Sequence, residues 1–359
     1  MKMKQVLATG AALSMALSMA PVTASAADKV DINVIAAQYG QQTADWWANF
    51  VTEFNEANPD INLNVEVVSW NDIYTVVNTR IANGEAPDVL NIDVFADYQA
   101  DDLLLPIQDV VSEETYSKMY DAFLAQSEVD GTVWAIPDLA SARAMYYNKD
   151  ILDAAGVEVP TTWDEFEEVL QKLSDAGIQP LTTGGSDKWG ATRLINAYAV
   201  RTAGNDIMTK AADGEVPYTD EKLVAAADKI AEWAEKGYFG EGITTVDMNT
   251  AGSMLMSGKA AIFYNGSWFT QNLTDDAQNP AGEDGIGFFN IPVADESISS
   301  ATSYSMNCGN ILALDNDKYD EATGWFLKYF MENIGNVAME DQGTVKGYTY
   351  DVAADDMDN

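Results

Sequence analysis

The sequence has no histidine and a single cysteine, and each shortage excludes a class of chemistry. Without histidine there is no Ser-His-Asp triad, no Cys-His pair and no imidazole-bound zinc, so acid-base or metal chemistry would depend on carboxylates. Cys308 has no second cysteine for an intrachain disulfide. Its setting in SMNCGNILAL favours a small buried thiol beside a strand over a nucleophile.

Positive charge is also scarce. The chain has 19 Lys and Arg residues against 57 Asp and Glu residues, which gives a formal net charge of -38. A surface this acidic repels the phosphates of nucleic acids and of anionic membranes, so a nucleic-acid partner is not expected. The acidity serves solubility first, and among small ligands it favours a neutral or cationic solute, a polyamine included.

Beyond its first residues the sequence lacks any apolar run near the roughly 20 residues that a membrane helix needs. The one shorter run, residues 6–20, follows two lysines and precedes the small-residue segment PVTASA. This is the layout of a secretory signal peptide, so we expect residues 1–26 to be removed. The mature chain is then exported, to the periplasm or the outer face of the cell membrane. No cysteine stands at the cleavage point, so direct lipidation is not expected.

What the sequence does contain is a repeated strand and helix rhythm near its start. Apolar residues predict a strand at 30–35, and aromatic residues at helical spacing predict a helix through 46–54. Residues 61–67 alternate as in a half-buried strand, then a helix at 72–82 leads to a strand at 88–92. This β-α-β order predicts an open, wound α/β sheet, and 359 residues favour two domains.

A second block of the same character begins near Arg143. AMYYNKDIL predicts a strand and a turn, and Thr162 with Glu165 forms a capping box ahead of an amphipathic helix. Further helices are predicted at 192–202 and 221–236, and further strands in AAIFYNGSW, GFFNIPV and NILAL. No low-complexity linker separates the two blocks, so short strands are expected to join the domains.

Four residues of the first block fall shortly after predicted strands, on the side where a cleft would open: Tyr39, Trp70, Asp93 and Tyr98. Tyr39, Trp70 and Asp93 are candidate ligand-binding residues. In open α/β sheets the ligand lies beyond the carboxyl ends of the strands, where the loops diverge. The paired Trp46 and Trp47, in contrast, are assigned to helix packing.

Further candidates stand in the second block. Trp189 in GSDKWGA and Trp268 in NGSWF lie in polar, loop-like segments, and Asn265 precedes Trp268. A flat indole face can stack on the C-H surface of a sugar while amides and carboxylates bind its hydroxyls, although a tryptophan at a loop edge can equally cap a core. Asp138 and Arg143, near the inferred crossover, either bind ligand hydroxyls or pair with each other. We favour ligand contact.

Two rival functions stay open at this point. Adjacent Tyr146 and Tyr147 with a carboxylate would suit ferric iron, but neighbours on a strand point to opposite faces. A secreted glycosidase would need two converging carboxylates, and 57 acidic residues do not reveal which two. The sequence shows no nucleophile elbow, phosphate-binding glycine loop, CxxC or EF-hand loop.

The order of several motifs resembles that of the extracellular solute-binding proteins of ABC importers, in the carbohydrate-binding group related to maltose-binding protein. The motifs are NGEAPDV with DLLLPI, GTVWAIPDL, AMYYNKDIL, VPTTWDEF, SGKAAIFYNGSW and FFNIPV, and together they span nearly all of the mature chain. The resemblance implies a two-lobed, type II periplasmic-binding-protein fold with crossover hinge strands and the ligand between the lobes. It implies lobes of 28–139 plus 269–314, and 140–268 plus 315–359.

By the same resemblance, the chain is a binding protein without enzymatic activity or cofactor. It would capture a mono- or oligosaccharide by lobe closure, deliver it to a membrane permease and act as a monomer. The resemblance also implies a ligand contact at Tyr304. The full set of candidate ligand-binding residues is Tyr39, Trp70, Asp93, Asp138, Arg143, Trp189, Asn265, Trp268 and Tyr304. Such proteins usually continue some tens of residues beyond GTVKGYTYD, so the second lobe is expected to be incomplete.

Overall fold

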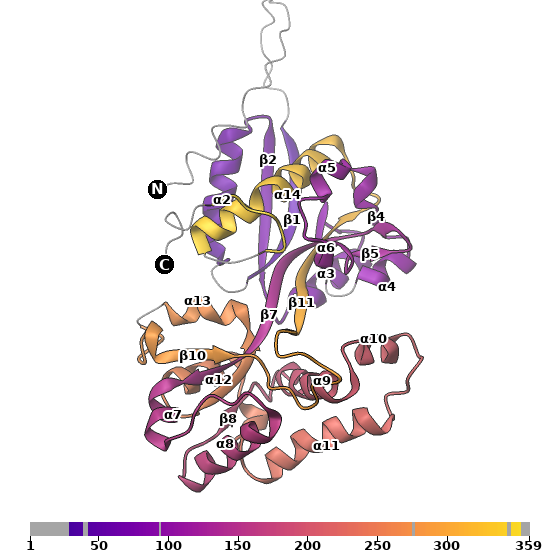
Figure 1. Ribbon diagram of the computed structural model, residues 1–359. Coiled ribbons are helices and arrows are strands. Elements are labelled where there is room, and N and C mark those ends of the chain that lie inside the picture. The colour runs from indigo at the N-terminus through magenta and orange to yellow at the C-terminus, as the bar shows by residue number, and fades with distance from the viewer. Residues whose placement is uncertain (1–28, 39–41, 93–94, 275–276, 343–345, 353–359) are drawn as a thin grey trace, which may run out of the picture. The chain divides into compact units, whose positions relative to one another are not determined.

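A computed structural model of the chain describes residues 29–38, 42–92, 95–274, 277–342 and 346–352 (Figure 1). The expected signal peptide and the candidates Tyr39 and Asp93 lie outside these residues. Contacts divide the chain into two compact units. Unit 1 comprises residues 1–141 and 307–359, and unit 2 comprises residues 142–306.

Unit 1 contains the predicted wound sheet. Its strands are β1 (Val30–Gln38), β2 (Ile61–Ser69), β3 (Val89–Ile92), β4 (Leu104–Leu105) and β11 (Met306–Asp315), with a small hairpin of β5 (Glu128–Val129) and β6 (Thr132–Val133). β1 is parallel to both β2 and β3, and β11 is antiparallel to β3 and β4. The predicted β-α-β order is therefore confirmed, and β7 (Ile136–Asn148) follows β11 in the strand order.

The helices of unit 1 bury apolar faces against this sheet. They are α2 (Ala44–Ala57), α3 (Ile73–Ala82), α4 (Phe95–Ala100), α5 (Glu113–Tyr116), α6 (Asp121–Leu124) and α14 (Glu321–Gln342), with a 3-10 turn η1 (Ile107–Asp109). Thr43 caps α2 by accepting a hydrogen bond from the backbone of Trp46 at 3.2 Å. Trp47, 2% exposed, packs in the core as the helical spacing predicted.

Helix α14 packs against α2, and this contact assigns the C-terminal residues to unit 1. The Phe54 ring on α2 lies 5.8 Å from that of Phe326 and 5.7 Å from that of Tyr329, centroid to centroid, and Figure 1 shows the two helices on one sheet. Residues 315–359 thus cluster with unit 1, whereas the sequence-based boundaries put them in the second lobe. Residues 269–306, expected in the first lobe, cluster with unit 2 because β10 (Ile286–Phe289) pairs with β7.

In unit 2 the strands of the sheet pair in the order β10-β7-β9-β8. The last part of β7 lies between β10 and β9 (Ile262–Gly266), antiparallel to both, and β8 (Leu181–Thr182) is parallel to β9. The strands predicted in AMYYNKDIL, AAIFYNGSW and GFFNIPV are therefore confirmed. Strand β7 is continuous across residues 141 and 142, so it belongs to both units.

The helices of unit 2 surround this sheet. They are α7 (Lys149–Ala155), α8 (Trp163–Asp175), α9 (Trp189–Ala203), α10 (Ile207–Ala212), α11 (Glu221–Glu235), α12 (Met248–Met256) and α13 (Thr270–Leu273), with 3-10 turns η2 (Ile243–Thr245), η3 (Ser267–Phe269) and η4 (Glu283–Gly285). The predicted capping box is present at α8, where Thr162 accepts from Glu165 N at 3.3 Å and Glu165 accepts from Thr162 N at 3.1 Å. Among the described residues, none of the helices combines the length with the apolarity that crossing a membrane would need.

Candidate ligand-binding site

Three of the sequence-predicted residues come together in unit 2. The guanidinium carbon of Arg143 lies 4.7 Å from the ring centroid of Trp268 and 5.4 Å from that of Trp189. The two indole rings are 6.1 Å apart, edge to face. Arg143 comes from β7, Trp268 from the turn after β9 and Trp189 from the start of α9, so the sheet and one helix build this group together.

A glycine makes the contact of Trp268 possible. Strand β9 pairs with β7 so that Gly266 lies opposite Arg143. A Cβ atom on Gly266 would collide with three atoms of the Trp268 ring. Because Gly266 has no side chain, the indole lies directly on the strand backbone beside the guanidinium. The NGSW motif at the end of β9 therefore supplies both the Trp268 ring and the glycine that fixes its position.

Trp189 is the first residue of α9 and not a loop residue as the sequence pattern predicted. The preceding turn is fixed to α12, because Asp187 accepts from Met248 N at 2.7 Å and Gly184 N lies 3.1 Å from the Met248 sulfur. Lys188, the N-cap residue of α9, has a φ of 63° and a ψ of -44°, a positive-φ conformation that is uncommon for a residue other than glycine. A Cβ atom on Gly190, the second residue of α9, would lie 2.6 Å from the Thr183 hydroxyl oxygen and 2.8 Å from the Met248 sulfur, so the helix start packs closely at a residue that has no side chain.

Arg143 is a buried charge. Its side chain and backbone are 4% exposed, and burial lowers its pKa from 12.5 to about 10, an effect that Tyr264 opposes and Arg193 reinforces. The guanidinium is still charged near pH 7. Among the described residues no carboxylate lies within ion-pair distance of it, and its Nη1 atom has no hydrogen-bond partner.

Two further arginines, which the sequence analysis missed, lie on α9. Arg193 follows Trp189 by four residues, so it shares that face of the helix. Arg201 is buried and donates to the carbonyls of Ser300 at 2.8 Å and Ser303 at 2.9 Å. The sequence signal that could have revealed them is the scarcity of arginine: the chain has four, and three are in unit 2.

The segment before β11 is held beside this group. Asn290 donates to the carbonyls of Ala301 at 2.8 Å and Ser303 at 2.9 Å, and the Ser305 carbonyl accepts from Arg143 N at 2.8 Å. Tyr304 stands in this segment with 44% of its surface exposed. The side chain of Tyr264, which burial gives a raised pKa, is hydrogen-bonded to Ser305.

The remaining described candidates have other surroundings. Asn265 is buried and accepts a hydrogen bond from the adjacent Gly266 N at 2.9 Å, so its side-chain oxygen is engaged with the backbone. Asp138 belongs to unit 1, where its carboxylate lies 3.7 Å from the buried ammonium of Lys346. Trp70 also belongs to unit 1, follows β2 as predicted and packs edge to face on Tyr74 with centroids 6.2 Å apart.

The two adjacent tyrosines lie on opposite faces of β7, as strand alternation predicts. Tyr146 packs against Phe269, with centroids 5.0 Å apart, and its hydroxyl donates to the Gly266 carbonyl at 3.3 Å. Tyr147 packs against Phe289 at 5.8 Å. In the part of the chain that the structure describes, there is no group of three or more acidic or cysteine side chains arranged to hold a metal ion.

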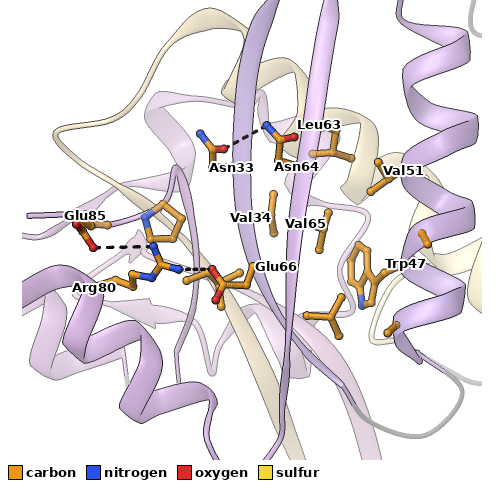
Figure 2. A pocket seen from close by; sticks show the side chains of 16 residues that line it. Asn33, Val34, Trp47, Val51, Leu63, Asn64, Val65, Glu66, Arg80 and Glu85 are labelled. Atoms are coloured by element: carbon orange, nitrogen blue, oxygen red, sulfur yellow. Dashed lines mark hydrogen bonds and ion pairs between the residues drawn. The ribbon is translucent and has the colours of Figure 1, made fainter.

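A separate hollow of about 790 Å³ lies on unit 1, beside β1, β2, α2 and the end of α3 (Figure 2). Trp47 and Val51 line it from α2, and Arg80 lies between two carboxylates, 2.7 Å from Glu66 and 4.0 Å from Glu85. The charge of Arg80 is thus balanced by neighbouring side chains, in contrast to that of Arg143.

Comparison with known proteins places the chain in a family. A family model of bacterial extracellular solute-binding proteins matches residues 39–342. The chain belongs to this family of solute-binding proteins. A solved structure from work on xylan utilization by the thermophilic bacterium Caldanaerobius polysaccharolyticus superposes with a TM-score of 0.82 at 19% identity, over 92% of this chain and 85% of that chain. The expected α/β solute-binding-protein fold is therefore confirmed.

Two curated relatives of this solute-binding protein are more similar in sequence. A putative binding protein of Brucella abortus (strain 2308) is 27% identical over 259 residues, which are 71% of this chain and 62% of the relative. A probable sugar-binding periplasmic protein of Rhizobium meliloti (strain 1021) is 28% identical over 274 residues, which are 70% of this chain and 61% of the relative. The chain thus spans less than two thirds of the length of either relative.

Proposed function

We propose that this solute-binding protein captures a mono- or oligosaccharide for an ABC importer and delivers it to the membrane permease without changing it chemically. The observation that carries the proposal is the group of Arg143, Trp189 and Trp268 in unit 2. Indole rings present flat apolar faces that suit the C-H surface of a sugar, and a guanidinium carries five donors for hydroxyl oxygens. A relative named as a probable sugar-binding periplasmic protein supports the same ligand class.

Capture by lobe closure requires ligand contacts on both units, because a ligand shifts a conformational equilibrium only by its differential affinity for the two states. Unit 2 would supply Arg143, Trp189, Trp268 and Tyr304. Unit 1 would supply Trp70 with Tyr39 and Asp93 beyond the ends of β1, β2 and β3. Strand β7, which is continuous between the units, is the natural hinge. We further propose that the protein is exported and acts as a monomer.

The test is calorimetric titration of residues 27–359 with a panel of mono- and oligosaccharides, followed by chromatography of the recovered sugar. Saturable binding with the sugar returned intact is the expected result. Release of reducing sugar would support a glycosidase instead. Binding of a polyamine by a folded protein that binds no saccharide would move the ligand class from sugars to cations.

A further inference from the structure

The arginines of this chain are distributed unevenly. Arg80 lies on unit 1 between two carboxylates. Arg143, Arg193 and Arg201 lie in unit 2, and the charges of all three act on Tyr264. The chain as a whole has a net charge of -38, so this group of positive charges around the buried Tyr264 side chain is of the opposite sign to the protein. This positive cluster coincides with the two indoles of the candidate ligand site, which lie edge to face.

Arg143 is the residue that makes the cluster informative. Removing a charge from water is costly, so buried charges in proteins are paired with opposite charges or hydrogen-bonded on every side. Arg143 is 4% exposed, its Nη1 atom has no partner, and no described carboxylate balances it. Among the groups whose charges act on Arg143, Tyr264 comes first and favours the cation, and the next, Arg193, is a second cation that adds to the imbalance. The two indole rings stabilise a cation only partly, by about 0.5 to 2 kcal/mol.

We propose that the ligand itself supplies the missing negative charge, so that the bound sugar is an acidic one whose carboxylate lies against Arg143 and Arg193. This inference rests on the proposed sugar-binding function and names its substrate class as uronic acids and their oligomers. A carboxylate matches the planar guanidinium with two parallel hydrogen bonds, which gives strength and direction at once. The sugar ring that carries it is then within reach of the indole faces.

Arg201 has a different part in this arrangement. Its two donated hydrogen bonds end on the carbonyls of Ser300 and Ser303, so it is a positioning residue for the segment that carries Tyr304.

The overall acidity of the chain, taken alone, favours a neutral or cationic ligand. The local charge around Arg143 favours the opposite, and short-range charges outweigh distant ones because salt screens interactions beyond about 10 Å.

The experiment compares matched pairs of sugars that differ only in the carboxylate. Residues 27–359 are titrated with D-galacturonate against D-galactose, D-glucuronate against D-glucose, and digalacturonate, with galactose 6-sulfate as a test of any anion. We expect at least one uronate to bind about tenfold or more tightly than its neutral counterpart, as charge-assisted hydrogen bonds are the stronger ones. Arg193→Gln should reduce that preference about tenfold, whereas Arg80→Gln, the matched control on unit 1, should leave it unchanged.

Each other result overturns the inference in a distinguishable way. Equal or tighter binding of the neutral sugars would overturn the acidic class and leave sugar capture standing. If the protein binds galactose 6-sulfate but none of the uronates, the proposal that the ligand carries a carboxylate is wrong. A folded protein that binds no saccharide of the panel would overturn both this inference and the proposed function. Equal loss of the preference in the Arg193→Gln and Arg80→Gln variants would remove the α9 arginine from the site.

Discussion

The indole ring of Trp268 occupies the place that a side chain on Gly266 would take. Because Gly266 pairs across the sheet with Arg143, this one missing side chain sets the distance between the indole and the guanidinium. The spacing of NGSW, with the glycine two residues before the tryptophan, is therefore a geometric requirement of the site.

Gly266→Ala should displace the Trp268 ring and weaken saccharide binding about tenfold, which corresponds to about 1.4 kcal/mol. Titration calorimetry measures the affinity, and tryptophan fluorescence reports the ring's new surroundings. Ser267→Ala, which removes only a neighbouring hydroxyl, is the control and should bind as the wild type does. Unchanged affinity and fluorescence in Gly266→Ala would show that the ring tolerates the added methyl group.

Trp268→Ala should weaken saccharide binding by about 1 to 3 kcal/mol, since it removes one of the two indole faces of the group. Trp325→Ala is the matched control, because this indole lies on α14 in unit 1 and is 40% exposed. Thermal unfolding of both variants separates lost affinity from lost stability. A folded Trp268→Ala protein with wild-type affinity would remove this residue from the site.

The buried pair of Asp138 and Lys346 should act on stability. The carboxylate and the ammonium lie 3.7 Å apart and are almost completely buried. Removing one partner leaves a buried charge, so Asp138→Asn or Lys346→Met should each lower the free energy of unfolding by about 3 to 5 kcal/mol. The double variant Asp138→Leu with Lys346→Met should lose less than the sum of the two. Urea unfolding measures this, and a change in ligand affinity at unaltered stability would instead favour the ligand-contact role for Asp138.

The capping box of α8 should make stability depend on pH in a defined direction. Hydrogen bonds from Thr161, first from its backbone, and from Thr162 lower the pKa of Glu165 below its ordinary 4.5. The folded state therefore favours the ionised carboxylate. Its contribution is complete above about pH 4.5 and is lost as the pH falls through the lowered pKa.

The free energy of unfolding of the wild type should therefore exceed that of Glu165→Gln near neutral pH, and the difference should shrink in acid. Glu168→Gln, at an exposed position of the same helix, is the control and should show no such trend. Urea unfolding from pH 2 to 7 measures all three proteins. A difference that is the same at every pH would mean that the ionised carboxylate is not what caps the helix.

Several features of the site followed from the sequence because they are local. The polar segments that hold Trp189 and Trp268, and the position of Arg143 in a predicted strand, marked three residues that the structure then brought together. Arg193 and Arg201 escaped notice because nothing in their own neighbourhood is unusual. Whether they lie near the site depends on which face of α9 packs toward β9. The sequence of a helix does not by itself show which face packs against its neighbours.

The local sequence also does not determine to which unit residues 269–359 belong. The sequence predicts two strands in this region and does not predict α14, and β10 could in principle join either sheet. The pairing of Gly287 with Tyr147 and the packing of Phe326 on Phe54 settle the choice, and both join residues more than a hundred positions apart.

The sequence by itself determined the absence of histidine chemistry, the strand and helix order of the first block, and the capping box of α8, because composition and short-range periodicity act within a few residues. Only the tertiary structure decided that Arg143 lies between two indoles without a described carboxylate, and that Gly266 makes room for one of them. The register of β7 against β9 and the packing of α9 create that arrangement. Both depend on residues that are far apart in the sequence, so no single segment of the chain predicts them.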